Sequence, residues 1–354
     1  MSYAIAAAGT GGHVFPGLAV GEALVLSGVA RSDVVYIGGS RLEAEVYPER
    51  GFPFVGVELA GLQRRLTVQN LRIPLVVGRA VSRIAAVLGE REVGALLGLG
   101  GYVTVPAGLA ARRAGVPFAV AEQNAHAGLA NRLMSRLAVG SFGSFPRTEG
   151  MPTATWVGNP VRASVLESVD RAVARAKYGL ADAGLVVGAF GGSLGAAVIN
   201  DAVEASVEAL DQHSISVLHL VGERNKELVS RADAHRNWVV VPFEDRMQDF
   251  YAACDLVVAR AGGAVAELLA TGTPSVLVPG AFGSGGHQDA NAKYLAESGA
   301  AVVLAQDRLG DLATTVVELM VDPARLEAMT AATGMLAKPD AAAIIAGELR
   351  SMHG

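Results

Sequence analysis

The sequence predicts an α/β protein built from two doubly wound parallel-sheet domains. Short apolar runs alternate with longer amphipathic stretches along the chain, which is typical of repeated βα units. The pattern of a strand followed by glycines at 3–12 returns at 185–193, so a second unit begins there. At 354 residues the chain is also too long for one core, since about 150 residues per domain is usual.

Nine apolar runs are the expected strands. They are apolar on both faces, as strands of a sheet covered by helices on each side must be. Such units form Rossmann-like sheets, which bind ligands at the carboxyl ends of their strands. The runs are 3–8, 34–37, 95–97, 118–120, 185–190, 217–221, 238–241, 256–259 and 275–278.

The junction between the domains is expected at 156–162. It contains Asn159-Pro160, and a residue before proline is disfavoured in a helix. We therefore expect an N-terminal domain at 1–161 and a C-terminal domain at 162–337. The final segment, 338–354, has helical spacing and is expected to pack back onto the first domain.

Composition excludes several classes of protein. The chain is 51% hydrophobic and 18% charged, but no apolar run reaches the length of a membrane span. The N-terminus lacks the basic region of a secretory signal, so a cytoplasmic protein is expected. A net charge of −5 argues against a nucleic-acid partner. The single cysteine, Cys254, excludes an intramolecular disulfide and is expected to be a buried small hydrophobe.

A glycine-rich loop, Gly9–His13, follows the first predicted strand and precedes a helix expected at Gly17–Leu26. Glycines allow close backbone approach, and a helix N-terminus offers N–H groups to an anion, so a diphosphate fits this chemistry. An imidazole at its mouth makes His13 a candidate general base. The alternative is a turn that only permits tight packing, with a structural histidine.

Two more polar loops follow strands of the same half. The loop Gly98–Pro106 carries Tyr102 and leads into a helix expected at Ala107–Arg113. The second loop carries Glu122, Gln123 and Asn124. Because parallel strands end at the same sheet edge, these loops are expected to form one wall of a cleft. The alternative for Glu122–Asn124 is a solvated turn.

The second half repeats this arrangement. Gly191–Ala196 offers glycines and the hydroxyl of Ser193 to a phosphate. Glu267, in the first turns of a helix after Arg260, can accept both hydroxyls of a ribose, or it complements only the helix dipole. The loop Gly283–Asn291 offers amide and carboxylate partners to sugar hydroxyls, or it is a functionless connection.

No motif indicates a metal or another cofactor. The chain has no Asp-x-Asp, no ligand cluster at metal-binding spacing, no Gly-x-Ser-x-Gly elbow and no Walker A lysine. Glycine loops, helix dipoles and Arg162 would then have to neutralise a bound diphosphate.

A basic and apolar stretch lies at 62–91. Its only acidic residue is Glu90, and its apolar side chains stand between the cations. Such a surface would bind an anionic membrane, although a helix packed on one face and solvated on the other has the same pattern. The cations are Arg64, Arg65, Arg72, Arg79, Arg83 and Arg91.

The ordered set of loop motifs resembles the family of peptidoglycan N-acetylglucosaminyltransferases. The motifs are Gly-Thr-Gly-Gly-His-Val-Phe-Pro from residue 9, Gly-Gly-Tyr-Val from 100, Glu-Gln-Asn from 122, Gly-Asn-Pro-Val-Arg from 158, Gly-Gly-Ser-x-Gly-Ala from 191 and Gln-x-x-Asn-Ala from 288. The resemblance implies a GT-B fold with two Rossmann-like domains facing a cleft. It also implies an inverting, metal-independent transfer of N-acetylglucosamine from UDP-N-acetylglucosamine to undecaprenyl-pyrophosphoryl-N-acetylmuramoyl-pentapeptide (lipid I), forming lipid II for cell-wall synthesis. The place implied is the cytoplasmic face of the cell membrane, as a peripheral protein.

The resemblance also implies roles for individual residues. His13 is the candidate base, and it lies with Tyr102 and Glu122 in loops that the family devotes to the acceptor. In the donor site, Glu267 would take the ribose hydroxyls and Gln288 the sugar. The residues implied for the donor are Thr10, Gly11, Gly12, Asn124, Arg162, Ser193, Glu244, Gly263, Ala264, Val265, Ala266, Glu267 and Gln288.

Three positions depart from the family pattern. Arg260 and Glu267 are seven steps apart instead of the usual eight, and the threonine usual between them is missing. Leu194 stands where glutamine is usual, and Ala121 replaces a frequent histidine. Two alternatives stay open: a soluble GT-B enzyme that acts on a small acceptor or epimerises the UDP-sugar, and a catalytically idle UDP-sugar-binding partner of a cell-wall complex.

Overall fold

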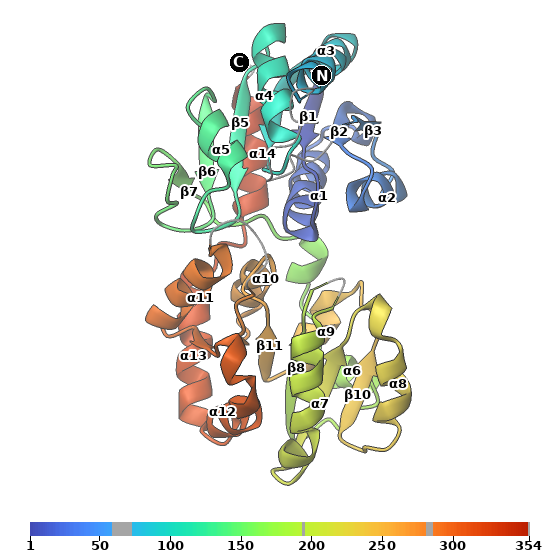
Figure 1. The fold of residues 1–354 in the computed structure, drawn as a ribbon, viewed down its shortest axis with the longest axis vertical. Helices are drawn as coiled ribbons and strands as arrows, with labels where there is room; N and C mark the ends of the chain where they lie inside the picture. The colour runs from blue at the N-terminus through green and yellow to red at the C-terminus, as the bar shows by residue number, and fades with distance from the viewer. Residues whose placement is uncertain (59–72, 193–194, 281–285, 353–354) are drawn as a thin grey trace. The chain divides into compact units, whose positions relative to one another are not determined.

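A computed structural model describes residues 1–58, 73–192, 195–280 and 286–352 (Figure 1). The chain divides into two compact units. The first unit is 1–163 together with 339–354, and the second is 164–338. Arg162, expected at the start of the second domain, therefore belongs to the first unit.

The first unit is built on a parallel sheet. Its order is β3-β2-β1-β4-β5-β6-β7 within the described residues, and each neighbouring pair is parallel. The order reverses between β1 and β4, which is the point where doubly wound sheets bind ligands. The strands are β1 (Ser2–Ala6), β2 (Val34–Gly38), β3 (Phe54–Gly56), β4 (Val93–Gly98), β5 (Phe118–Glu122), β6 (Gly140–Gly143) and β7 (Thr155–Trp156).

Helices cover both faces of this sheet. Alternate residues of β1 point to opposite faces, so Tyr3 and Ile5 join one buried cluster and Ala4 and Ala6 join another. The first cluster contains side chains of α1, α2 and α14, and the second contains side chains of α3, α4 and α5. The helices are α1 (Gly11–Leu26), α2 (Leu42–Glu49), α3 (Ile73–Glu90), α4 (Thr104–Ala114), α5 (Leu129–Met134) and α14 (Ala341–Ser351).

The last helix, α14, returns to the first unit, where it lies beside α1 (Figure 1). Ile345 and Leu349 are fully buried in the same cluster as α1. Arg350 donates from Nη1 to the carbonyl oxygen of Ser27 at 3.0 Å, just past the end of α1. The C-terminal segment thus completes the core of the N-terminal unit.

The second unit repeats the design with the order β10-β9-β8-β11-β12-β13, again parallel throughout the described residues. The strands are β8 (Leu185–Phe190), β9 (Ile215–Leu220), β10 (Trp238–Val241), β11 (Leu256–Ala259), β12 (Ser275–Leu277) and β13 (Ala301–Val303). The helices are α6 (Arg171–Lys177), α7 (Ala197–Asp211), α8 (Glu227–Ala232), α9 (Met247–Ala253), α10 (Ala264–Thr271), α11 (His287–Glu297), α12 (Leu312–Met320) and α13 (Pro323–Leu336).

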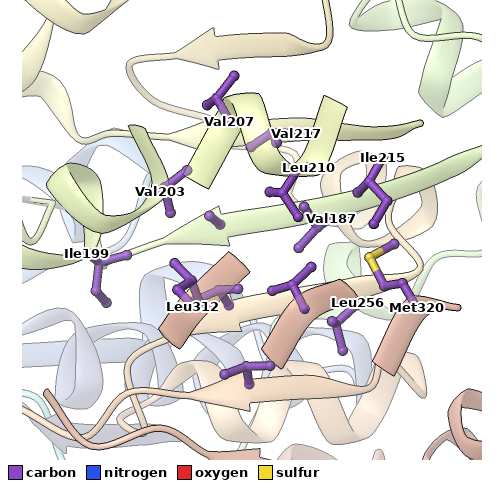
Figure 2. Close-up of a cluster of buried hydrophobic side chains, with 14 of the residues drawn as sticks. Val187, Ile199, Val203, Val207, Leu210, Ile215, Val217, Leu256, Leu312 and Met320 are labelled. Atoms are coloured by element: carbon purple, nitrogen blue, oxygen red, sulfur yellow. The ribbon is translucent and has the colours of Figure 1, made fainter. Parts of the chain in front are cut away.

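One core of this unit lies between the sheet and α7, α8, α12 and α13. Figure 2 shows Val187 of β8 and Leu256 of β11 among side chains of α7 and α12. Cys254 is 8% exposed, and burial raises the pKa of its thiol, so its expected place as a buried small hydrophobe is confirmed. The predicted class, two doubly wound parallel-sheet domains, is confirmed as well.

Candidate functional site

The loop after β1 is shorter than the sequence predicts, because α1 begins at Gly11 and not at Gly17. Gly9 turns the chain with a φ of +111°, Thr10 stays extended, and the N–H of His13 donates to the carbonyl oxygen of Thr10 at 3.0 Å. Pro16 stands inside the helix, at the cost of one backbone hydrogen bond. Gly11, Gly12 and His13 therefore form the first helical turn, where the N–H groups of Gly11 and Gly12 have no acceptor within the helix.

The loop after β4 is in contact with the loop after β1. A Cβ at Gly101 would overlap the carbonyl oxygen of Ala8, and Gly100 and Gly101 have φ values of +93° and +72°. A Cβ at Gly100 would also lie 3.0 Å from both Cδ2 and Nε2 of His13. Only glycine fits both positions, and the imidazole lies directly on this backbone.

The helix after this loop also starts early, at Thr104 and not at Ala107. The Thr104 hydroxyl accepts from the N–H of Gly100 at 2.9 Å and donates to the carbonyl oxygen of Gly100 at 2.8 Å. The Thr104 side chain thus satisfies both backbone groups of Gly100, in the loop before the helix.

A buried carboxylate ties these loops to α2. Glu43 is 0% exposed, and it accepts from the N–H of Gly9 at 3.2 Å, the N–H of Gly39 at 2.9 Å and the hydroxyl of Tyr102 at 3.1 Å. Burial and the Glu43 carboxylate raise the pKa of Tyr102 to about 12, so the phenol stays protonated at neutral pH. Glu43 was not predicted from the sequence, since a glutamate inside a short helix carries no signal of burial.

The loop after β5 is not a solvated turn. Glu122 and Gln123 are 3% and 7% exposed. Glu122 Oε1 accepts from the backbone and side-chain nitrogens of Asn124 at 3.1 and 2.9 Å. Its Oε2 accepts from the N–H of Gly128 at 3.0 Å and from Asn131 Nδ2 at 2.9 Å. The alternative of a solvated turn is wrong, because the carboxylate binds its own loop.

Arg162 lies in the first unit beside the start of α1. It is 6% exposed, and its guanidinium carbon stands 5.0 Å from the centroid of the Phe15 ring. A Cβ at Gly11 would lie 3.0 Å from Phe15 Cε2. This places the cation close to the glycines of the first helical turn.

The second unit also gathers loops at its strand ends, after β11 and β12. Gln288 of α11 accepts through Oε1 from the N–H of Gly280 at 2.8 Å. Its Nε2 would be 3.8 Å from a Cβ at Gly262. Asn291, one helical turn later, is 1% exposed and donates to the carbonyl oxygen of Ala261 at 2.9 Å. The amides of α11 therefore join the Gly262 and Gly280 loops.

Glu267 is in the first turn of α10, whose preceding residue is Gly263. Its Oε2 accepts from the hydroxyl of Tyr251 at 2.8 Å. Arg260, at the start of the same loop, is 9% exposed and donates to the carbonyl oxygen of Val278 and to Gln306 Oε1, both at 3.1 Å. Burial lowers the pKa of this guanidinium.

The segment around Glu244 is held by a charged network. Glu244 Oε2 accepts from Lys177 Nζ at 2.8 Å and from the hydroxyl of Tyr178 at 2.7 Å. Lys177 also bonds Asp249 Oδ2 at 2.8 Å. The side chains of Glu244 and Asp249 are 10% and 9% exposed, so the network is largely shielded from water.

Comparison with known proteins identifies the family. The N-terminal domain of glycosyltransferase family 28 matches residues 3–142, and its C-terminal domain matches 186–345. A protein of Mycobacterium sp. (strain KMS) is 39% identical over 98% of this chain and 94% of its own length. This chain belongs to glycosyltransferase family 28.

The mycobacterial relative is named UDP-N-acetylglucosamine--N-acetylmuramyl-(pentapeptide) pyrophosphoryl-undecaprenol N-acetylglucosamine transferase. A protein of the same name from Halorhodospira halophila is 40% identical, covering 96% of this family 28 chain and 94% of its own length. Among solved structures, Acinetobacter baumannii MurG has a TM-score of 0.76 and 29% identity, with 99% and 100% of the two chains covered. The resemblance inferred from the loop motifs is confirmed.

A putative UDP-N-acetylglucosamine 2-epimerase from Listeria monocytogenes is also similar, with a TM-score of 0.69, 16% identity and 99% and 96% of the chains covered. At that identity the likeness shows the shared fold alone. It does not support the alternative that this family 28 chain is an epimerase.

Some expected residues lie outside the described part of the family 28 chain. These are Ser193, Leu194, the start of the Gly283–Asn291 loop at 283–285, and 62–72 of the basic stretch. Among the described residues, no group of three or more His, Cys, Asp and Glu side chains could hold a metal ion. None of the helices in that part of the chain is both long and apolar enough to span a bilayer.

Proposed function

We propose that this chain transfers N-acetylglucosamine from UDP-N-acetylglucosamine to undecaprenyl-pyrophosphoryl-N-acetylmuramoyl-pentapeptide. The observation that carries the proposal is the name shared by relatives that are 39–41% identical over nearly the whole chain. The glycine loops at the carboxyl edges of both sheets fit a reaction between two diphosphate-bearing substrates.

The donor site belongs mainly to the second unit. Glu267 accepts the ribose hydroxyls, the backbone of Gly263–Ala266 faces the diphosphate at the start of α10, and Gln288 binds the sugar. Its hydrogen bond with Gly280 supports this, together with the 3.8 Å between its Nε2 and a Cβ position at Gly262, since both place the amide near the loop that precedes α10. Ser193 completes the diphosphate site by family resemblance.

The backbone of Glu244 contacts the uracil. Its side chain supports this role indirectly, since both carboxylate oxygens are engaged: Oε1 accepts from the N–H of Arg246 at 2.8 Å, and Oε2 accepts from Lys177 and Tyr178. A loop held by its own side chain can present its backbone to a base in one fixed geometry.

The acceptor site belongs to the first unit. His13 and Tyr102 stand on two loops that touch one another, and the imidazole lies on the backbone of Gly100. Glu122 contributes by shaping the third loop, where it bonds Asn124. The donor-binding roles of Thr10, Gly11, Gly12 and Asn124 are proposed from the family resemblance.

The reaction is a single displacement. A hydroxyl of the acceptor sugar attacks the anomeric carbon while His13 takes its proton. The bond from that carbon to the diphosphate oxygen breaks, and UDP leaves with the electron pair, so the configuration inverts. Proton removal by a positioned base contributes roughly 10²- to 10⁴-fold to the rate.

Charge on the departing diphosphate is met without a metal. Arg162 and the N–H groups at the starts of α1 and α10 supply the positive potential. Arg162 supports this role because it is buried beside Phe15, so a nearby anion would be only weakly screened.

The membrane contact is proposed for α3 and the stretch before it, 62–91. In the described part of this stretch Leu75 is 59% exposed, and Arg79 and Arg83 are exposed on the same helix. Each cation near an anionic surface contributes about 1 kcal/mol. Binding would place the chain on the cytoplasmic face of the cell membrane.

Co-sedimentation with phosphatidylglycerol vesicles tests this contact. Replacing Arg79 and Arg83 with glutamate should lower partitioning at least roughly 30-fold, whereas Arg224→Glu on the second unit should not change it. Equal partitioning of both variants would show that α3 does not bind the membrane.

Transfer of labelled N-acetylglucosamine tests the function. Wild-type enzyme should move the label from UDP-N-acetylglucosamine into a product that extracts with lipid, and only when the lipid acceptor is present. Label in a water-soluble product would favour a small-molecule acceptor. Conversion of the UDP-sugar without acceptor would favour an epimerase, and binding without turnover would favour the catalytically idle alternative.

A further inference from the structure

Glu43 is a charged group in an unusual place. It is the second residue of α2, and its side chain is fully buried. Among the described residues, no Lys, Arg or His nitrogen lies within 4.0 Å of its carboxylate. A buried carboxylate costs several kcal/mol unless hydrogen bonds replace its hydration, so a purely structural position would favour an apolar residue.

The hydrogen bonds that Glu43 receives come from three different loops. Gly9 follows β1, Gly39 follows β2 and Tyr102 follows β4. These strands are neighbours in the sheet, in the order β2-β1-β4. One side chain therefore joins three adjacent strand ends at the edge where the candidate acceptor site lies.

The packing around Glu43 leaves no room for another arrangement. A Cβ at Gly39 would overlap the hydroxyl of Tyr102, and a Cβ at Gly38 would stand 2.6 Å from Glu43 Cγ. The backbone of the β2 loop thus packs directly against the bonded pair of Glu43 and Tyr102. Both glycines are needed so that the carboxylate can reach all three donors.

The Glu43 carboxylate also influences the position of His13. Its Oε2 fixes the N–H of Gly9, next to Thr10, and the carbonyl oxygen of Thr10 accepts from the N–H of His13. The imidazole also lies close to Gly100, in the loop that carries Tyr102, and the Tyr102 hydroxyl donates to Oε1. The two oxygens of Glu43 thus hold the loop that leads to His13 and the loop that lies against its imidazole.

Glu43 stays ionised under working conditions. Burial raises its pKa, but hydrogen bonds from its own N–H, Gly9, Gly39 and Tyr102 lower it, and the net pKa lies below the ordinary value of 4.5. Three donors require a group that only accepts, and an ionised carboxylate is such a group. A protonated carboxyl or an amide would also donate, so that two donors would face each other.

We propose that Glu43 is a positioning residue for transfer: it holds the loops after β1, β2 and β4 in the arrangement that places His13 and Tyr102. It does not touch the reacting atoms. The inference rests on the roles proposed above for His13 and Tyr102, so it needs a measurement that is independent of turnover.

Glu43→Gln tests the proposal, with Glu45→Gln, an exposed glutamate on the same helix, as the matched control. Amide hydrogen exchange should become faster in 8–14, 38–43 and 98–104 of the Glu43 variant and stay unchanged in the control. Turnover should fall about 10- to 100-fold, because small misplacement of reacting groups has effects of that size. The Kd for UDP should change less than turnover does, since the donor site is proposed to lie mainly in the second unit.

A double-mutant cycle separates positioning from loss of stability. Glu43 and Tyr102 act through one hydrogen bond, so the turnover losses of Glu43→Gln and Tyr102→Phe should be less than additive. If Glu43→Gln fails to fold, Tyr102→Phe alone should still speed exchange in 38–43 and lower turnover.

The outcomes are distinct. Unchanged exchange in Glu43→Gln overturns the proposal, and so does faster exchange with turnover equal to that of Glu45→Gln. Wild-type enzyme that transfers no sugar contradicts the proposed function, while the exchange comparison still decides whether Glu43 holds the loops.

Discussion

The imidazole of His13 lies against the backbone of Gly100, where a Cβ would stand 3.0 Å from its Cδ2 and Nε2 atoms. A candidate base thus depends on the absence of a side chain on a neighbouring loop. Asn131 Nδ2 would lie 3.3 Å from the same Cβ, so it also leaves no room for a side chain at position 100.

Gly100→Ala should lower turnover about 10- to 100-fold, because the added methyl group displaces His13. Gly115→Ala is the matched control: its φ of +70° is as unfavourable for alanine, but nothing lies within 4 Å of its Cβ position. Gly115→Ala should lose about 1 kcal/mol of stability, and Gly100→Ala at least as much. Steady-state kinetics and urea unfolding compare the two variants. Equal turnover of Gly100→Ala and Gly115→Ala would show that the position of His13 does not matter for catalysis.

Glu267→Gln should weaken UDP binding roughly 10- to 100-fold, since hydrogen bonds to a charged acceptor contribute about 1.5–3 kcal/mol. Calorimetry with UDP and 2′-deoxy-UDP measures it, and the variant should discriminate less between them. Glu227→Gln, in the first turn of α8, is the control. An unchanged UDP to deoxy-UDP ratio would mean that Glu267 only complements the dipole of α10.

Lys177→Met should raise the KM for UDP-N-acetylglucosamine about 3- to 10-fold with a smaller change in kcat. It removes the ion pairs that hold Glu244 and Asp249, both at 2.8 Å, and so loosens the segment proposed to meet the uracil. Lys226→Met, which breaks an exposed pair with Glu223, should have no such effect. A KM for UDP-N-acetylglucosamine equal to that of Lys226→Met would show that the Glu244 segment does not contribute to donor binding.

The sequence predicted the central strands and the loops that follow them, because buried parallel strands are continuous apolar runs and glycine loops mark their ends. It missed β3, β6, β7 and β13, of which β3 and β6 contain glycine and β7 is only two residues long. It placed the starts of α1 and α4 too late, because residues of the first helical turn look like loop residues.

Some residues of the candidate site could be predicted from the sequence. His13, Tyr102 and Glu122 stand in motifs, so their sequence neighbours indicated a role. Glu43 depends on contacts with residues 34 and 59 positions away, which no local pattern encodes. Arg162 was found through its motif, but its place in the first unit, beside Phe15, was not predicted.

Acid should destabilise the second unit through His219. This side chain is fully buried, and burial lowers its pKa to about 3, whereas the unfolded chain takes up a proton near pH 6.5. Between these values the unfolded state binds more protons, so stability falls as pH falls, by up to about 1.4 kcal/mol per pH unit. Urea midpoints between pH 6.5 and 5 should fall less in His219→Gln than in wild type, and His213→Gln should follow wild type.

The central claim is transfer to the lipid acceptor with His13 as the base. Its most direct test is the turnover of His13→Ala with labelled UDP-N-acetylglucosamine and saturating lipid acceptor, measured beside the Kd for UDP. Wild type should form labelled lipid product, and the variant should be slower by roughly 100-fold or more with a Kd within about twofold of wild type. Turnover of the variant equal to that of wild type, or no lipid product from either enzyme, would contradict the account.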